Sequence, residues 1–212
     1  MPRIINVTNG VPLYAENNLP FGDDLPLLCE SMELLKSIKG KIITDILKLY
    51  NWEPSEYLNK PFNIPVNQLF KRALGPVFFV LENELCVGFY SSSLNQSVLV
   101  WREDLPLRFD VLAEKFQYIV EKGSLIDCRN KHFGDVQFAN VIGRKITRLT
   151  IFKTSEPKTI PYRTERGLLV GLDNGTDFLI SKGLQEKSSD FILMFDEKIR
   201  ASLKDIITPI EV

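Results

Sequence analysis

Cysteine and histidine are scarce in this sequence of 212 residues, which contains three cysteines and one histidine. Cys29, Cys86 and Cys128 are odd in number and widely spaced, so they favour neither a disulfide framework nor a CxxC metal site. Unpaired thiols of this kind are typical of proteins in a reducing compartment. We therefore expect a cytoplasmic protein with free cysteines.

Long apolar segments are also lacking. No apolar run approaches the roughly 18 residues that cross a bilayer. The first residues, "MPRIINVTNG", do not have the basic and then apolar pattern of a signal peptide. These absences predict a protein without a membrane segment.

The chain lacks the short motifs of common enzyme classes, namely GxGxxG and the P-loop for nucleotides, GxSxG for hydrolases and HExxH for zinc proteases. Cys128 and His132 lie close together in "DCRNKHFGD", between Asp127 and Asp135. A catalytic cysteine also needs an oxyanion donor, and a closed zinc site needs four ligands, so this spacing supplies neither. We predict a protein that is not an enzyme, with no catalytic residues, no cofactor and no metal site.

Charge is balanced overall but not along the chain. The formal net charge is -1, whereas residues 129–166 contain nine Lys and Arg against three Asp and Glu. Such a segment is either ordinary solvated surface or a surface for an acidic partner. The overall balance argues against a generally basic nucleic-acid-binding protein, and weak nucleic-acid binding through residues 129–166 is kept as an alternative.

The N-terminal region, residues 1–76, is predicted to be mainly helical and packed on the core. Five apolar side chains recur at steps of three and four, as on one face of a helix. They are Leu35, Ile38, Ile42, Ile46 and Tyr50. Gly40 predicts a kink or two consecutive helices, because glycine weakens a helix interior. Several prolines then divide the chain into turns, with one short helix at 66–72.

Residues 77–123 predict a first meander of three antiparallel strands followed by a helix. The strands are the apolar runs "VFFVL", "LCVGFYSS" and "SVLVW", which are separated by turns. The helix extends from Asp104 to Gly123, because apolar residues there share one helical face. These residues are Phe109, Leu112, Phe116 and Ile119.

Residues 124–212 predict a second meander. Ile146 and Leu149 are out of phase for one strand face, which indicates a β-bulge near Thr147 and Arg148. The turn at 173–175, "DNG", predicts a hairpin that joins "LLVGL" to "DFLIS". "DFILMF" supplies a third strand, and residues 196–204 are expected to form a short helix.

The two meanders follow the same pattern of strands and turns. Their aligned pairs are Leu81 with Leu172, Asn83 with Asn174, Val87 with Ile180, and Leu94 with Leu184. Duplication and convergence on a common strand pattern are both compatible with this alignment. The predicted fold class is α+β, with antiparallel meanders, helices packed on one side and one compact unit.

The C-terminal third resembles a known protein family. "FANVIGRKITRLTIFK", the loop after it, "GLLVGLDNGTDFLIS" and the last strand are similar to the meander of immunity proteins from bacterial polymorphic and contact-dependent growth inhibition toxin systems. The similarity covers residues 136–196. It implies a cytoplasmic bacterial protein that binds one cognate toxin, such as a nuclease, and blocks the toxin's active site or its access to the target.

Charged residues in turns and loops are the candidates for toxin binding. Acidic turns would meet a toxin with a basic cleft, and arginines would meet an acidic toxin. The acidic candidates are Glu82, Glu84, Asp173, Asp177 and Asp190, and the basic candidates are Arg144, Arg148, Arg163 and Arg166. A non-catalytic adaptor or structural subunit of a larger assembly is an alternative function of a different class.

Overall fold

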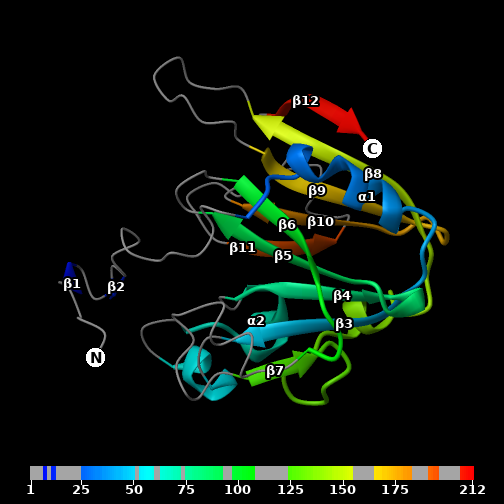
Figure 1. Ribbon diagram of the computed structural model, residues 1–212. Coiled ribbons are helices and arrows are strands. Elements are labelled where there is room, and N and C mark those ends of the chain that lie inside the picture. The colour runs from blue at the N-terminus through cyan, green and yellow to red at the C-terminus, as the bar shows by residue number, and fades with distance from the viewer. Residues whose placement is uncertain are drawn as a thin grey trace.

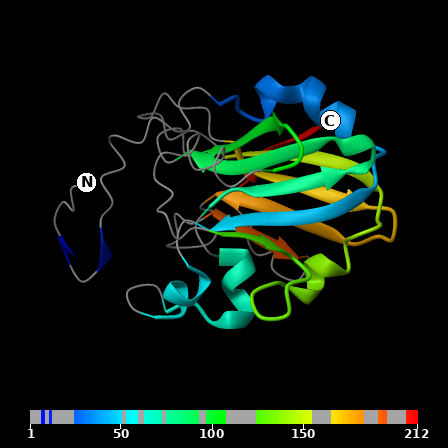
Figure 2. The ribbon, with the colours of Figure 1, turned by 60° about the horizontal axis from the view of Figure 1, so that its bottom comes forward.

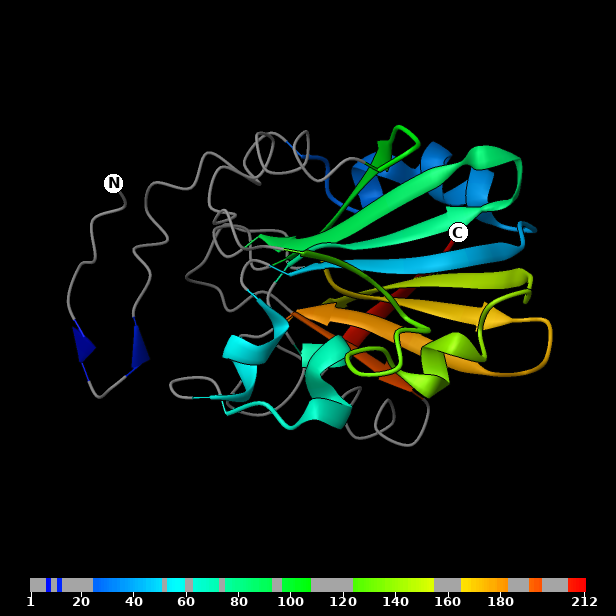
Figure 3. The same ribbon diagram turned by 90° about the horizontal axis from the view of Figure 1, so that it is seen from below.

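Two antiparallel sheets of five strands each pack face to face in this protein (Figure 1). The structure is a computed structural model that describes residues 7–8, 11–12, 25–50, 53–59, 63–72, 75–92, 97–107, 124–154, 165–182, 191–195 and 206–212. The two layers are seen edge-on in Figure 3. A short hairpin of β1 (Val7–Thr8) and β2 (Val11–Pro12) is separate from both sheets.

The two sheets have the same strand order. In each, four consecutive strands form a meander, and the fifth strand returns to pair with the first. The first sheet, in the order β6-β5-β4-β3-β7, contains β3 (Ile43–Tyr50), β4 (Val77–Leu81), β5 (Cys86–Ser92), β6 (Ser97–Glu103) and β7 (Ser124–Asp127). The second sheet, in the order β11-β10-β9-β8-β12, contains β8 (Ile146–Thr154), β9 (Glu165–Leu172), β10 (Asp177–Lys182), β11 (Phe191–Phe195) and β12 (Ile206–Glu211).

The helices that the structure describes are short and lie along the edges of the sandwich (Figures 1 and 2). Among the described residues the α-helices are α1 (Met32–Ile38), α2 (Val66–Arg72) and α4 (Val136–Ala139), and the 3-10 turns are η2 (Cys29–Ser31), η3 (Pro54–Leu58) and η4 (Glu82–Glu84). Leu35 and Ile38 of α1 enter the space between the sheets, as do Phe70 of α2 and Phe138 of α4. The helices therefore close the edges of the core, while the inner face of each sheet is covered mainly by the other sheet.

Side chains that alternate between the two faces of each strand form the main core on the inner faces of the sheets. In β4, Val77 and Phe79 point to the inner face, whereas Phe78 joins a separate cluster with Trp101 on the outer face. The two sheets meet through aromatic side chains, and the rings of Phe79 and Phe178 lie 5.7 Å apart with an edge-to-face geometry. The core is continuous across both halves of the chain.

Each half of the chain contributes one sheet. We call residues 32–127 the first half and residues 136–212 the second half. Pairing registers correspond: Phe79 pairs with Val87 in the first sheet, and Val170 pairs with Phe178 in the second. The fifth strands also pair at equivalent positions: Leu47 of β3 pairs with Asp127, and the equivalent Thr150 of β8 pairs with Glu211. The halves therefore share topology and register.

The starts of β3 and β8 cross each other and connect the halves. Ile42 and Lys145 form an antiparallel bridge. Four backbone hydrogen bonds surround this bridge in two reciprocal pairs: Gly40 N to Ile146 O and Gly143 N to Ile43 O at 2.7 Å, and Ile43 N to Arg144 O and Ile146 N to Lys41 O at 2.9 Å. Equivalent segments thus donate to and accept from each other, as expected for two halves related by an approximate twofold axis.

Several predictions of local structure are confirmed. The fold is α+β with antiparallel meanders, and the short helix at 66–72 is present as α2. The register shift between Ile146 and Arg148 is the predicted bulge, and the "DNG" segment forms the turn between β9 and β10. Gly175 adopts φ of 80°, the left-handed conformation for which glycine is suited.

Other predictions are wrong. The apolar repeat does not continue as helix beyond Ile38, because Gly40 turns the chain with φ of 87° and the residues from Ile43 form β3. The register pairs Val87 with Phe79 and Phe178 with Val170, so Val87 corresponds to Phe178 and not to Ile180. The predicted helices around Phe109–Ile119 and at 196–204, and the aligned pair Leu94 and Leu184, lie outside the described residues.

Candidate protein-binding surface

The crossing of β3 and β8 brings two hairpin turns to one end of the sandwich. Glu82 N, in the turn between β4 and β5, donates to Ile42 O at 3.0 Å. At the equivalent place Asp173 N, in the turn between β9 and β10, donates to Lys145 O at 3.0 Å. We call this end, formed by residues 39–45, 82–84, 143–148 and 173–177, the bridged end. It is on the right in Figure 1.

Most of the predicted binding residues lie at the bridged end. Six of the nine candidates are there: Glu82, Glu84, Asp173, Asp177, Arg144 and Arg148. Arg166, by contrast, is near the start of β9 at the far end of that strand, where burial lowers the pKa of its guanidinium. Asp190 and Arg163 lie outside the described residues.

The tips of the two turns are fixed by local backbone chemistry. Asn83 and Glu84 both have positive φ, 63° and 60°, in the first turn. In the second turn Gly175 has positive φ, and the side chain of Asn174 accepts a hydrogen bond from Thr176 N at 3.0 Å. Because both turns are also tied to the β3 and β8 segments, their exposed side chains project from a well-supported backbone.

Charges of both signs meet at this end. Arg148 forms an ion pair with Asp177, and Lys41 lies 3.9 Å from Glu82. Exposed pairs of this kind contribute little stability, roughly 0 to 1 kcal/mol each. In the part of the chain that the structure describes, Glu84, Arg144, Lys145 and Asp173 have no ion-pair partner and are exposed. These four side chains remain available for complementary charges on a partner.

Lys145 was not among the predicted candidates, although it lies at the centre of the bridged end. Its importance comes from its bridge with Ile42, which joins residues about a hundred positions apart. A sequence signal exists in the similar segments "GKIIT" from Gly40 and "GRKIT" from Gly143. Comparing the starts of the two halves, as well as their hairpins, would have revealed it.

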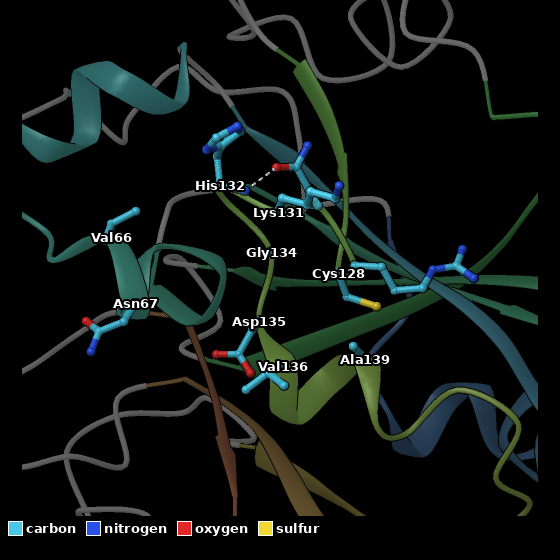
Figure 4. A pocket seen from close by; sticks show the side chains of 11 residues that line it. Val66, Asn67, Cys128, Lys131, His132, Gly134, Asp135, Val136 and Ala139 are labelled. Atoms are coloured by element: carbon cyan, nitrogen blue, oxygen red, sulfur yellow. Dashed lines mark hydrogen bonds between the residues drawn. The ribbon is translucent and has the colours of Figure 1, made fainter.

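The loop from Cys128 to Asp135 forms a separate open cleft of about 510 Å³ beside α2 and α4 (Figure 4). The sulfur of Cys128 and the ring of His132 point in different directions there. Burial, together with the charges of Asp127 and Asp45, raises the pKa of the Cys128 thiol to about 12. This thiol is therefore protonated at neutral pH, and the geometry does not make it a catalytic nucleophile.

The nearby carboxylates already have partners within the chain. The Arg129 guanidinium lies 2.9 Å from Asp45 and 2.7 Å from Asp127. Hydrogen bonding to Arg129 lowers the pKa of Asp127, whereas burial raises the pKa of Asp45. Asp45, Asp127 and Cys128 place possible ligand atoms within 4.8 Å of one another. Since Arg129 pairs with both carboxylates and the thiol is protonated, this group fits an internal ion-pair cluster better than a metal site.

In the described parts of the basic segment, 129–154 and 165–166, the cations do not form one continuous surface. Arg129 pairs with Asp45 and Asp127, Arg148 with Asp177, and Lys153 with Glu165 at 3.4 Å. Much of the local positive charge is therefore balanced by acidic residues. A phosphate backbone would require a row of available cations, so this arrangement disfavours nucleic acid as the partner.

Comparisons with known proteins do not assign the chain to a family. No family matches the chain, and no curated protein or solved structure is significantly similar to it. Within the described ranges, none of the helices combines the length and apolar character needed to cross a membrane.

Proposed function

We propose that this protein is a cytoplasmic immunity protein that binds and neutralises one cognate bacterial toxin domain through the bridged end. The observation that carries the proposal is the reciprocal hydrogen bonding that ties both charged turns to the crossing of β3 and β8. The resemblance of residues 136–196 to immunity proteins supplies the class of partner.

The bridged end has physical properties that suit protein recognition. Turns held by backbone hydrogen bonds lose little conformational freedom on binding, which favours affinity. Exposed charges of both signs select a partner with the complementary pattern and repel others. Glu84 and Asp173 would face a basic cleft, such as the substrate cleft of a nuclease, while Arg144 and Lys145 would face acidic groups at its margin.

The test is a pull-down of the tagged chain with the product of the adjacent gene, followed by a toxicity assay. We expect one stoichiometric partner that is toxic when expressed alone and harmless when co-expressed. Recovery of a multi-protein assembly without relief of toxicity would instead favour the adaptor alternative.

Charge reversal at the bridged end then tests the binding surface. Glu84→Lys with Asp173→Lys, or Arg144→Glu with Lys145→Glu, should weaken toxin binding at least tenfold, about 1.4 kcal/mol. The matched control is Glu53→Lys with Glu56→Lys, at exposed positions near η3 and away from the bridged end. Equal loss in the control variant would show that overall charge, and not this surface, governs binding.

A further inference from the structure

The open cleft beside α2 and α4 is unusual for its exposed apolar side chains. Among the described residues three large hydrophobic side chains are exposed, namely Leu58 at 37%, Val66 at 49% and Val136 at 73%. Two of the three, Val66 and Val136, line this one cleft (Figure 4). Exposed apolar groups that gather in a concave site commonly mark a binding surface.

The polar lining of the cleft includes an available cation. Lys131 is exposed and has no ion-pair partner among the described residues, whereas Arg129, on the same loop, pairs with Asp45 and Asp127. Asp135 is the lining carboxylate, and it is already held by Lys71 at 3.1 Å and by the backbone N–H groups of α4. Among the lining residues that the structure describes, no unpaired carboxylate would repel an acidic ligand.

The shape of the cleft is set by the loop that connects the two halves. Gly134 cannot be replaced by a larger residue here, because a Cβ atom would lie 2.2 Å from Cys128 O. Asn130 stabilises the loop by accepting hydrogen bonds from His132 N and Phe133 N at 2.9 and 3.0 Å. Val66 and Val136, on the two helices, therefore lie at a fixed position beside the loop that carries Lys131.

We propose that this cleft binds an acidic peptide segment in which an aliphatic side chain is adjacent to carboxylates. The aliphatic group packs between Val66 and Val136, and the carboxylates lie near Lys131. The charge complementarity and the open form of the cleft favour a protein segment, whose remaining residues continue past the rim. This proposal does not depend on the toxin-binding function of the bridged end.

The test uses the full chain and defined peptides observed by 1H–15N NMR. The probe is the acetylated, amidated peptide Gly-Leu-Glu-Asp-Gly, and its controls are Gly-Leu-Lys-Lys-Gly and Gly-Gly-Glu-Asp-Gly. We expect saturable shifts of the amide signals of Val66, Lys131 and Val136 with the probe, and at least fivefold weaker binding of both control peptides.

Two variants and a matched control locate the contact. Val136→Asp should weaken probe binding about tenfold, because it removes an apolar contact and adds a like charge, and Lys131→Glu should weaken it about fivefold. Both positions are exposed, so the folded spectrum should persist. Lys36→Glu, at an exposed position of α1, should leave binding unchanged. Shifts that map elsewhere, equal binding of the lysine peptide, or absence of saturable binding at millimolar peptide would overturn the proposal.

Discussion

The first and second halves of the sandwich share strand order and pairing register, but they pack different side chains at equivalent positions. In both, a positive-φ glycine precedes the first strand, at Gly40 and Gly143, and a register shift follows within a few residues. The two halves therefore agree in backbone geometry at these points, although the side chains along their strands differ.

Side-chain pairs at equivalent register positions differ in composition. On the outer face of the first sheet, Gly88 pairs with Trp101 across β5 and β6. The corresponding pair in the second sheet is Leu179 with Met194, across β10 and β11. One half thus combines the smallest residue with the largest, and the other uses two of intermediate size. The bulk of the pair is therefore concentrated at one position in the first half and divided between two positions in the second.

Buried charge is also handled differently. Lys48 is fully buried on the inner side of β3, where its Nζ donates to Phe70 O at 2.8 Å. The equivalent residue of β8 is the apolar Ile151, because Lys48 pairs with Ile126 as Ile151 pairs with Ile210. In the second half the partly exposed Lys153 has the buried Glu165 as its ion-pair partner. Lys48 therefore has a backbone carbonyl as its partner, whereas Lys153 has a carboxylate.

The largest effect is expected when one member of the outer-face pair is exchanged between halves. In Gly88→Leu the new side chain would overlap the Trp101 ring, since even a Cβ atom would lie 2.4 Å from it. Trp101 cannot easily move, because it packs edge-to-face on Phe78 and its Nε1 donates to Glu103 at 2.9 Å. We expect a loss of about 4 kcal/mol in the free energy of unfolding, measured by urea denaturation.

The double variant Gly88→Leu with Trp101→Met copies the pair of the second half. It should recover at least half of the loss, because the added and removed volumes then compensate. If the double variant were as unstable as Gly88→Leu alone, the equivalence of the two pairs would be wrong.

The next effect is expected at the buried Lys48. Burial lowers the pKa of Lys48 from 10.5 to about 7. Between these values the unfolded chain binds more protons than the folded chain, so the free energy of unfolding should rise with pH from 7 to about 10.5. Lys48→Ile, which copies Ile151, should remove this slope and stabilise the protein at pH 7 by about 3 kcal/mol, after allowance for the lost hydrogen bond.

Urea denaturation at pH 7, 8.5 and 10 measures this slope. Lys36→Ile, at an exposed position of α1, is the matched control and should retain it. A wild-type curve as flat as that of Lys48→Ile would show that Lys48 keeps its charge in the folded protein.

How much of this structure the sequence predicts depends on the range of the interactions involved. The β9–β10 turn, the bulge beside Thr147 and the strands β4 to β6 follow from neighbouring residues, and they are predicted correctly. β3 is not, because its apolar residues are buried on both faces: Ile46 lies in the inter-sheet core, while Leu47 and Leu49 pack on the outer face. A strand of this kind lacks alternation, and its sequence also fits one face of a helix.

The candidate surface shows the same division. Charged turn residues such as Glu84 and Asp173 are recognisable locally, whereas their meeting at one end depends on the bridge between Ile42 and Lys145. β12 is missed for a similar reason: it pairs with β8, more than fifty residues earlier, and includes Pro209. Pairing over such distances has no local sequence signature. The individual residues of the site could therefore be predicted, but their meeting at one end of the sandwich could not.

A moderate effect is expected at the ion pair of the second half. The Glu165 carboxylate is fully buried, accepts a hydrogen bond from Cys29 N at 2.9 Å and lies 3.4 Å from Lys153 Nζ. Glu165→Gln keeps the shape but leaves Lys153 without its carboxylate. Because Lys153 is partly exposed, we expect the free energy of unfolding to fall by about 2 kcal/mol. This is less than the penalty for leaving a fully buried charge without its partner. Urea denaturation checks this value, with the exposed Glu33→Gln as a control expected to lose less than about 0.5 kcal/mol.

The smallest effect is the sharpest test of equivalence, because two hydroxyl groups make the same contact in the two halves. Thr44 Oγ1 donates to Val80 O at 3.0 Å, and Thr147 Oγ1 donates to Gly171 O at 3.1 Å. Each hydrogen bond lies at a register shift beside the bridged end. Thr44→Val and Thr147→Val should each destabilise the protein by about 1 kcal/mol, and the two losses should agree within about 0.5 kcal/mol. Because these sites belong to different sheets, their effects should also add in the double variant. Unequal losses would show that these two hydrogen bonds, although they occupy equivalent positions, contribute differently to the stability of the protein.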